Sequence, residues 1–373
     1  IYSFISYLKV SPVKLQLKVL TKKADINNHI ETIQKEMDEE TDERCFVLQE
    51  DYLKLIRRIG SKEAVTRRFF IAFEYEPFHT NRRNEEAEAI SALLTATRTA
   101  KAYLQNCGNE VIQPEQEDEF ITDLLYSLLN RQSSIHKPLS LKINEVIEQY
   151  QSYGRNLNEI NLAEFIAPDS IDFKHSNYVL MDGIYHSYLL IPSMGYRPHV
   201  GAGWLSLLVN AGDGIDVDLF LERQPKDRIQ QKLGQQIRIN RSKIKDTSDT
   251  NSDFDDLDNA IRSGYYLKEG LSNHEDFYYM NLLLTITADS VEELEWRINE
   301  MKKLLVSQDM DVLTLHFREE QAFLSALPLV TLNKKLFELS KRNILTSAAA
   351  SCYPFTSYEM SDDNGILLGV NKH

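Results

Sequence analysis

The sequence predicts an α+β fold made of two duplicated β-α-α-β-α-β-α modules joined by a hairpin-containing connector. Three observations predict it. The stretch from Phe277 to Leu327 has the pattern of one complete packing unit. A stretch in the N-terminal third repeats its order of elements, and the elements upstream of both stretches also match. Such repetition at similar lengths, with weak sequence identity, indicates a duplicated architecture.

The C-terminal unit opens with apolar residues that alternate from Tyr278 to Ile286, the pattern of a strand with one face on a core. Ser290 and Glu293 then form a Ser-x-x-Glu capping box, which starts a helix. Its apolar stripe is predicted to face the strand and comprises Val291, Leu294, Ile298, Met301 and Leu305. A strand over Val312 to Phe317 and a helix over Glu319 to Leu327 complete the unit.

The N-terminal copy has the same order of elements. The sequence predicts a strand over Phe69 to Tyr75, a long helix from Asn84, a short strand at Val111 and Ile112, and a helix over Glu115 to Asn130. The long helix is expected to turn inward Ala87, Ile90, Leu94 and Leu104. The last helix carries a stripe of Phe120, Leu124 and Leu128.

Upstream of each copy, the pattern predicts one strand followed by two helices. In the first module these are Val13 to Leu20, Ile26 to Met37 and Glu43 to Ile59. In the second module they are Ile215 to Leu221, Asp227 to Lys243 and Leu257 to Glu269. We therefore expect the same topology in both modules.

These patterns divide the chain into a first module (1–131), a connector (132–203), a second module (204–330) and a terminal segment (331–373). The connector contains a helix over Leu141 to Tyr150. A hairpin is predicted to follow, with strands Asn177 to Leu180 and Ile184 to Ile191, because Asp182-Gly183 suits a type I′ turn. The terminal segment begins with a helix over Asn333 to Ser340.

Composition narrows the class of protein. The 373 residues suffice for two ordinary domains, and 42% hydrophobic with 26% charged residues is typical of a soluble globular protein. No apolar run reaches the length of a membrane span. The net charge of −14 argues against broad affinity for nucleic acid. The three cysteines are far apart, which predicts neither disulfides nor a zinc site and fits a reduced, cytoplasmic compartment.

Local motifs give no catalytic, cofactor-binding or metal-binding residue. The aspartate-rich stretch from Asp246 to Asp258 lacks the central Gly and terminal Glu of a calcium loop, so we interpret it as a solvated, mobile loop. Gly201-Ala202-Gly203 is too short to hold a phosphate, and no G-x-x-x-x-G-K-[ST] motif occurs. His274-Glu275 lacks a second His at the metalloprotease spacing and is expected in a surface loop.

Scattered polar residues leave an enzymatic alternative open. Asp213, Asp216 and Asp218 alternate around a strand start, where a polar strand face beside a Gly turn is the simpler interpretation. Cys352 is expected to be a small buried side chain. A stand-alone enzyme would require groups such as His199, Asp213 and Cys352 to converge in one pocket.

A basic cluster stands out in this acidic protein. It flanks the strand Phe69 to Tyr75 and comprises Arg57, Arg58, Lys62, Arg67, Arg68, Arg82 and Arg83. It could meet anionic lipid, an acidic partner or a phosphate backbone. The alternative is a solvated face paired with the many carboxylates. A stand-alone nucleic-acid-binding protein would use this cluster.

Several stretches come in an order that resembles a known family. They are Phe165 to Pro168, Tyr188 to Ile191, Gly195 to Pro198, Gly203 to Leu205, Asp216 to Leu219, Thr346-Ser347, Tyr353 to Phe355, and Asp363 to Asn371. Their order resembles the N-terminal domain of the TraC/TrbE-type ATPases of conjugative type IV secretion systems, a VirB-four-like family. The resemblance spans about 163–373, and the first module is compatible with it by element order only.

This resemblance implies a non-catalytic docking domain of a cytoplasmic ATPase at the inner face of the cell membrane. In the family, this domain contacts inner-membrane channel proteins and neighbouring subunits of a hexamer, and direct DNA binding by it is not expected. The resemblance places ATP, magnesium and the catalytic residues in a RecA-like motor domain beyond His373. Because Ile1 is not an initiator Met and both ends look cut, we expect the chain to be a fragment of a longer protein. Gly365 to Asn371 resembles the family's approach to its motor, so we expect the parent chain to continue into a P-loop domain within a few tens of residues of His373.

Overall fold

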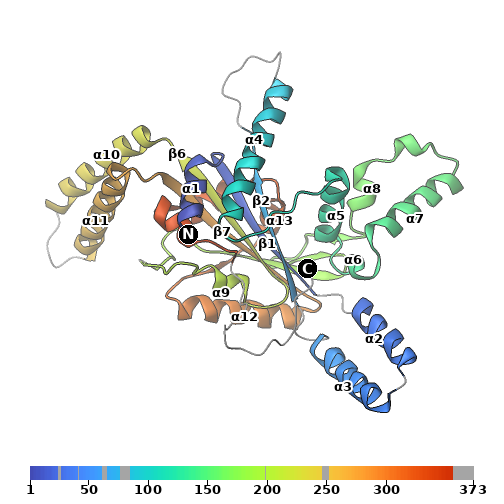
Figure 1. Cartoon of the computed structure of the whole chain (residues 1–373). Coiled ribbons are helices and arrows are strands. Elements are labelled where there is room, and N and C mark those ends of the chain that lie inside the picture. The colour runs from blue at the N-terminus through green and yellow to red at the C-terminus, as the bar shows by residue number, and fades with distance from the viewer. Residues whose placement is uncertain are drawn as a thin grey trace.

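The computed structural model describes residues 1–23, 27–40, 42–60, 65–75, 85–197, 199–245 and 252–355. The described chain is 54% helix and 18% strand, with one nine-stranded sheet, so the predicted α+β class is confirmed. Figure 1 shows the sheet at the centre, with helices on both faces and helical hairpins extending beyond its ends.

Strands from the first module, the connector and the second module all join this sheet. Its order is β2-β1-β6-β7-β5-β4-β3, while β8 pairs with β5 and β9 with β7, and every described pairing is antiparallel. The strands are β1 (Lys14–Lys23), β2 (Val65–Phe73), β3 (Ile171–Asp172), β4 (Val179–Met181), β5 (Ile184–Leu190), β6 (Ile215–Gln224), β7 (Phe277–Ala288), β8 (Leu313–Thr314) and β9 (Arg342–Leu345).

The helices fall into those that cover the sheet and those that project from it. The covering helices are α1 (Tyr2–Val10), α4 (Glu85–Gln105), α5 (Glu117–Leu129), α9 (Ser206–Val209), α12 (Val291–Ser307), α13 (Glu319–Ala326), α14 (Lys334–Ser340) and α15 (Thr346–Ser351). The others are α2 (Asn27–Glu39), α3 (Glu43–Gly60), α6 (Ser133–His136), α7 (Leu139–Ser152), the 3₁₀ turn η1 (Leu157–Glu159), α8 (Leu162–Ile166), α10 (Lys226–Lys245) and α11 (Ser252–Ser272).

One face of the sheet, called here the first face, is mostly apolar. Its core includes Leu17 of β1, Val217 of β6 and Leu284 of β7. Helices α1, α4, α9, α12 and α15 contribute buried side chains to this core. Burial of this continuous apolar surface is the main favourable term for folding.

The opposite, second face combines apolar patches with buried polar side chains. Leu124 and Leu128 of α5 pack on β1, while Ala322 of α13 and Leu336 of α14 belong to a core around Leu283. Between these patches lies a polar band, buried under the same helices, made of Gln16, Lys18, His186, Asp216, Asp218, Asn281, Thr285 and Thr287. Buried polar groups require partners, which gives this face its specific geometry.

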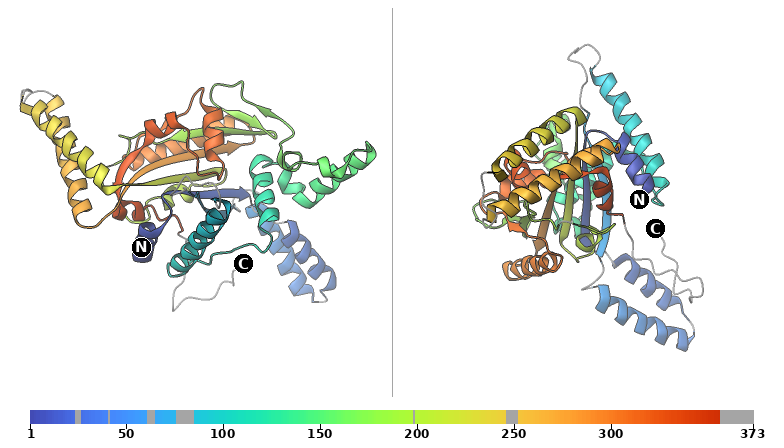
Figure 2. Two further views of the ribbon diagram at one scale, coloured as in Figure 1. Left: turned by 90° about the horizontal axis from the view of Figure 1, so that it is seen from above. Right: turned by 90° about the vertical axis from the view of Figure 1, so that its left-hand side faces the viewer.

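Two helical hairpins extend from opposite ends of the molecule. The α10–α11 hairpin connects β6 to β7 and leaves one end of the sheet, whereas the α2–α3 hairpin connects β1 to β2 and leaves the other (Figures 1 and 2). The α2–α3 hairpin buries Ile33 and Leu53 but exposes Leu48, Tyr52 and Leu55 at helical spacing. Side chains at i, i+4 and i+7 lie on one face of a helix, so α3 presents an exposed apolar stripe.

Several local predictions are confirmed. Asp182 and Gly183 have positive φ angles, of 51° and 77°, as a type I′ turn requires. The Ser290 side chain accepts a hydrogen bond from the Glu293 N–H at 3.2 Å and caps α12. The predicted pair of helices follows both β1 and β6, and the stretch from Asp363 to Asn371 lies outside the described residues.

Two predicted strands are wrong or shorter than predicted. Val111 and Ile112 form no strand, since Ile112 is 81% exposed and Val111 packs only at the edge of the first-face core. The strand predicted over Val312 to Phe317 is reduced to Leu313–Thr314, because Phe317 adopts a left-handed φ of 57° and is exposed. At Val111 and Ile112, β-propensity alone did not supply a partner strand.

The orientation of some side chains was also predicted wrongly. Ile90 and Leu94 do not face inward but are exposed, because the N-terminal half of α4 runs past the sheet (Figure 1). β7 is buried on both faces rather than one. Its polar residues, such as Asn281 and Thr285, lie under the second-face helices.

The aspartate-rich stretch is not a loop along its whole length. Residues 252–258 belong to α11, and 246–251 lie outside the described residues. Asp255 lies in the first turn of α11, where a carboxylate interacts favourably with the helix dipole. Of the helices described, none combines the length and the apolar character needed to cross a bilayer.

Candidate functional site: an arginine-lined cavity

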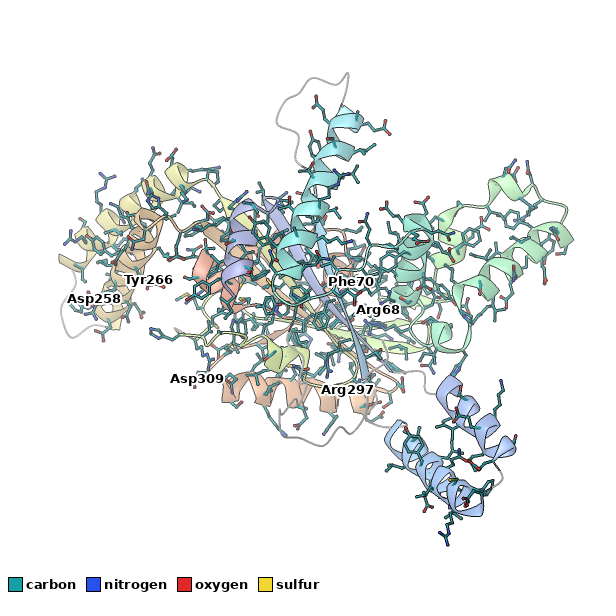
Figure 3. The ribbon with its side chains drawn as sticks, viewed as in Figure 1. Arg68, Phe70, Asp258, Tyr266, Arg297 and Asp309 are labelled. Atoms are coloured by element: carbon teal, nitrogen blue, oxygen red, sulfur yellow. The ribbon has the colours of Figure 1, made fainter. Side chains whose placement is uncertain are left out.

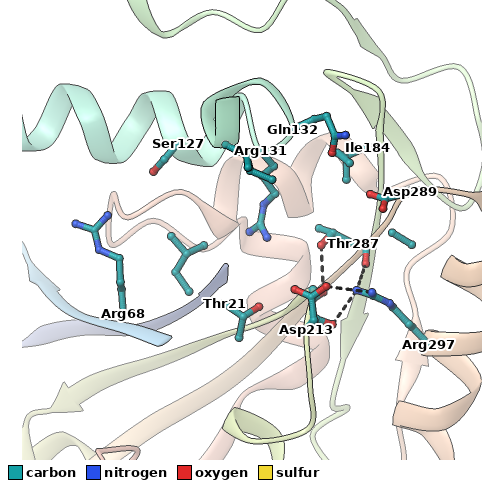
Figure 4. A pocket seen from close by; sticks show the side chains of 14 residues that line it. Thr21, Arg68, Ser127, Arg131, Gln132, Ile184, Asp213, Thr287, Asp289 and Arg297 are labelled. Atoms are coloured by element: carbon teal, nitrogen blue, oxygen red, sulfur yellow. Dashed lines mark hydrogen bonds and ion pairs between the residues drawn. The ribbon is translucent and has the colours of Figure 1, made fainter. Parts of the chain in front are cut away.

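A cavity opens at the edge of the second face, where six separate stretches of the chain meet. Three arginines line it: Arg68 from β2, Arg131 from the turn after α5, and Arg297 from α12 (Figure 4). Asp213 and Asp289 lie at the side of the cavity opposite to Arg68. The three guanidinium groups have different surroundings, and these differences decide what the cavity can do.

Arg297 is fully engaged in holding the sheet together. Its Nη1 donates to the backbone oxygens of Asp213 and Thr287, both at 2.8 Å. Its Nη2 donates to Glu293 at 2.7 Å and to the Asp213 carboxylate at 3.2 Å. Because the group joins the start of β6, the end of β7 and α12, its role is structural.

Arg131 is only partly satisfied. Its Nη2 donates to the Asp216 carboxylate, and its side chain is 14% exposed. The Arg131 Nε–H is buried without a hydrogen-bond partner. Burial lowers the pKa of Arg131 to about 10, since a charged guanidinium loses hydration there. Figure 4 shows its side chain pointing from the helical layer into the cavity.

Arg68 lies on the other side of the cavity. Its guanidinium carbon is 5.4 Å from the ring centre of Phe70 and 5.7 Å from that of Phe120, both cation–π distances (Figure 3). Among the described residues, no carboxylate or carbonyl accepts a hydrogen bond from Arg68. Its positive charge is therefore not neutralised by a described ion pair.

A buried ion pair lies next to the cavity at the centre of the sheet. Lys18 Nζ donates to Asp218 at 2.8 Å and to the Ala326 backbone oxygen at 2.8 Å. Gln16 Nε2 donates to the other Asp218 oxygen at 2.9 Å. Burial lowers the pKa of Lys18 and raises the pKa of Asp218, because desolvation outweighs their mutual attraction.

His186 is buried beside this polar band. Its Nε2 has no hydrogen-bond partner, and burial with the nearby charge of Arg131 holds its pKa well below the usual range. The ring is therefore neutral at physiological pH. The ring is enclosed, and its Nε2 has no hydrogen-bond partner in the part of the chain that the structure describes, so it is unsuited to proton transfer with a bound molecule.

The groups required by the enzymatic alternative have unlike environments. His199 is exposed, and Asp213 is held by Arg297 in the cavity. Cys352 is buried with its Sγ 3.6 Å from the Met280 sulfur, and burial raises the pKa of its thiol to about 12. Of the three, only Asp213 lines the cavity, so His199, Asp213 and Cys352 form no nucleophile and base pair there.

The predicted basic cluster is only partly described. Arg67 donates from Nε to the Val209 backbone oxygen at 2.9 Å, and Arg68 stacks on aromatic rings. Both side chains contact the molecule itself and are half-buried, so they are not part of a free basic surface. Lys62, Arg82 and Arg83 lie outside the described residues, as do the side chains of Arg57 and Arg58.

Sequence reasoning missed the pairing of Asp216 and Asp218, which are buried rather than part of an exposed polar face. The sequence did hold one indication of this pairing. Gln16 and Lys18 alternate with apolar residues in β1, just as Asp216 and Asp218 do in β6. The sequence around Arg131 does not mark it as a cavity residue, because it lies in an ordinary polar turn. In the described ranges, no group of three or more His, Cys, Asp or Glu side chains is placed to hold a metal ion.

Comparison with models of known protein families and with curated proteins gives no match for this chain.

Proposed function

We propose that this chain is a non-catalytic docking and assembly domain of a cytoplasmic ATPase that energises conjugative DNA transfer through a type IV secretion channel. The proposal begins from the order of sequence motifs that resembles the TraC/TrbE-type ATPases. In that family, ATP hydrolysis belongs to a C-terminal motor, and the N-terminal domain binds inner-membrane channel proteins and neighbouring subunits. The same division of roles is proposed here, with a position at the inner face of the membrane.

One structural observation carries the proposal: the connector motifs pack against the terminal motifs. The Gly203 N–H donates to the Ser351 backbone oxygen at 2.8 Å. Tyr196 and Trp204 are buried in the same core as Cys352. Motifs about 150 residues apart thus form one packed junction. We propose that this junction fixes the position of the motor domain relative to the sheet.

The projecting hairpins supply the docking surface in this proposal. The apolar stripe of α3, made of Leu48, Tyr52 and Leu55, is assigned to the inner-membrane channel proteins. Arg67 is not assigned to this role, because its side chain is hydrogen-bonded to the Val209 backbone oxygen. The first module therefore faces the channel through its helical hairpin, and the second module supports the motor.

The test is co-purification with membranes that contain the channel proteins of the secretion system. Replacing Leu48, Tyr52 and Leu55 together by Ser is expected to reduce the channel protein recovered by about tenfold, since apolar contacts dominate such interfaces. The matched control is Trp296→Ser on the exposed side of α12, where recovery should not change. Equal recovery with the triple variant, at an unchanged melting temperature, would refute the docking assignment.

We also propose that the two modules arose by duplication. A two-fold axis through the Lys18–Asp218 pair would exchange β1 with β6 and β2 with β7, in agreement with the sheet order. α4 and α12 share the first face, and α5 and α13 share the second. An experimental structure in which β1-α2-α3-β2 fails to superpose on β6-α10-α11-β7 about this axis would contradict the duplication.

One observation favours a second candidate function, contact with nucleic acid. α10 has seven basic residues and one acidic residue, in a chain of net charge −14. Arg228, Lys232, Arg238 and Arg241 are exposed on it, and Tyr265 and Tyr266 are exposed on the adjacent α11. Cations beside aromatic rings suit single-stranded nucleic acid.

Fluorescence anisotropy with a single-stranded oligonucleotide tests this second candidate. We expect binding whose affinity falls steeply as the salt concentration rises, and we expect R238Q/R241Q to lose this binding. Absence of binding by the unaltered chain at low salt would exclude the candidate.

A further inference from the structure

We propose that the cavity between Arg68 and Arg131 is a binding site for a carboxylate group. The ligand is either a small carboxylic acid or an acidic side chain of a binding partner, and the two share the same chemistry. This inference rests on the geometry of the cavity and does not depend on the docking function. It assigns a ligand class to a place where sequence reasoning found no site.

The cavity contains N–H donors that no described residue uses. The Arg131 Nε–H is buried without a partner, and a buried polar group left unpaired is costly. The N–H groups of Arg68 have no acceptor among the described residues, although its guanidinium lies over the rings of Phe70 and Phe120. Both arginines line the same cavity, so an oxygen-bearing ligand between them would satisfy donors from each.

The charges around the cavity also favour a carboxylate. Arg297 is neutralised by Asp213 and Glu293, and Arg131 is paired with Asp216. Arg68 is left as the uncompensated cation on its side of the cavity, with Asp289 on the opposite side (Figure 4). A single positive charge matches a singly charged carboxylate. A phosphate dianion would add a second negative charge near Asp213 and Asp289.

The arrangement of the donors in the cavity matches the shape of a carboxylate. A guanidinium presents its donors in a planar fork that matches the two oxygens of a carboxylate. The Gln132 side chain also lines the cavity and can donate from its amide. Leu20 and Ile184 supply apolar surface beside these donors, as in ordinary small-ligand sites.

The experiment is isothermal titration calorimetry of the whole chain with three probes in a buffer free of carboxylates. The probes are sodium acetate, sodium phosphate and an N-acetylated peptide that contains one glutamate. Acetate is expected to bind with a Kd on the order of 1 mM, from the binding energy available to a ligand of four heavy atoms. Tighter binding of the peptide would identify a partner side chain as the ligand; equal binding would indicate a small acid.

Two variants test the site itself. Arg68→Gln is expected to weaken acetate binding about tenfold, because it removes the uncompensated charge and its hydrogen bonds. Arg131→Lys retains the charge beside Asp216 but removes the Nε–H, and it should weaken binding several-fold. The matched control is Arg262→Gln, an arginine exposed on α11 whose loss should leave the affinity unchanged.

The possible results distinguish a carboxylate site from its absence. No acetate or peptide binding by the unaltered chain, or phosphate binding without carboxylate binding, overturns the proposal. Unchanged acetate affinity in Arg68→Gln also overturns it. If Arg131→Lys fails to fold, Arg68→Gln still decides the question, since that residue forms no described ion pair. Failure of the channel co-purification would leave these results untouched, so the two proposals fail separately.

Discussion

Lys18 and Asp218 face each other across the β1–β6 ladder, with Lys18 Nζ 2.8 Å from an Asp218 carboxylate oxygen and both side chains at most 1% exposed. This pair joins the first strand of one module to the first strand of the other. It lies in the middle of a sheet whose opposite face is mostly apolar. β1 and β6 therefore meet through a charged contact that is enclosed on the second face.

Removing one partner of this pair should destabilise the folded protein much more than removing both. Asp218→Ala leaves Lys18 buried without its counter-charge and should lower the free energy of unfolding by about 3–5 kcal/mol. K18M/D218L should be within about 1 kcal/mol of the unaltered protein, since desolvation offsets most of the attraction. Urea unfolding of the double-mutant cycle measures the coupling. A double variant as unstable as the single one would contradict this expectation.

Stability should depend on pH through His186. Its pKa is depressed in the folded state by burial, whereas the unfolded chain titrates near the ordinary value of about 6.5. As pH falls below about 6.5, only the unfolded state binds this proton, so stability is lost by up to about 1.4 kcal/mol per pH unit until the depressed pKa is reached. Above about pH 6.5 the contribution of neutral His186 to the free energy of unfolding is fully retained.

His186→Leu isolates this effect, because the described structure gives the imidazole no hydrogen bond to lose. The unfolding free energies of the variant and the unaltered protein, measured from pH 7 to pH 5, should diverge as pH falls. The variant should lose less stability. Parallel curves over this range would show that His186 is protonated in the folded protein.

Gly214 should tolerate no side chain. Its φ is +71°, and an added Cβ would lie 2.5 Å from the Thr287 backbone oxygen and closer still to Arg297. Gly214→Ala is expected to cost about 2–4 kcal/mol from strain and the disrupted Arg297 contacts. At Gly201 an added Cβ meets no atom within 4 Å, so Gly201→Ala should change stability by less than about 0.5 kcal/mol. Equal melting temperatures for the two variants would contradict this account.

The chain should not bind ATP appreciably. Phosphate binding of the P-loop type needs a glycine-rich loop and its lysine, and no such motif occurs in the sequence. Calorimetry with Mg-ATP should show no heat of binding, and micromolar affinity would mean that a nucleotide site exists here. Acetate serves as the comparison in the same instrument, because its proposed site needs no glycine-rich loop.

The sequence alone predicted most of the individual elements. The alternation from Tyr278 to Ile286 and the Ser290 cap are local patterns, and local patterns need no knowledge of distant residues. Predictions were wrong where a distant element decided the result. Ile112 found no partner strand, and Ile90 lies on a part of α4 that the sheet does not reach.

The cavity could not be predicted in the same way. Arg68, Arg131 and Arg297 are separated by 63 or more residues, and nothing in their neighbourhoods marks them as a set. They meet because β2 and β6 flank β1, while α5 and α12 lie on opposite faces of the sheet. Only this arrangement leaves the Arg131 Nε–H without an acceptor.

By itself, then, the sequence determined which segments become strands and helices, because hydrophobic period and capping act over a few residues. The tertiary structure decided that both modules share one sheet through the Lys18–Asp218 pair, and that three distant arginines line one cavity. The physical reason is that strand pairing and burial depend on which surfaces meet. That choice is made by the energy of the whole packed molecule and not by any one segment.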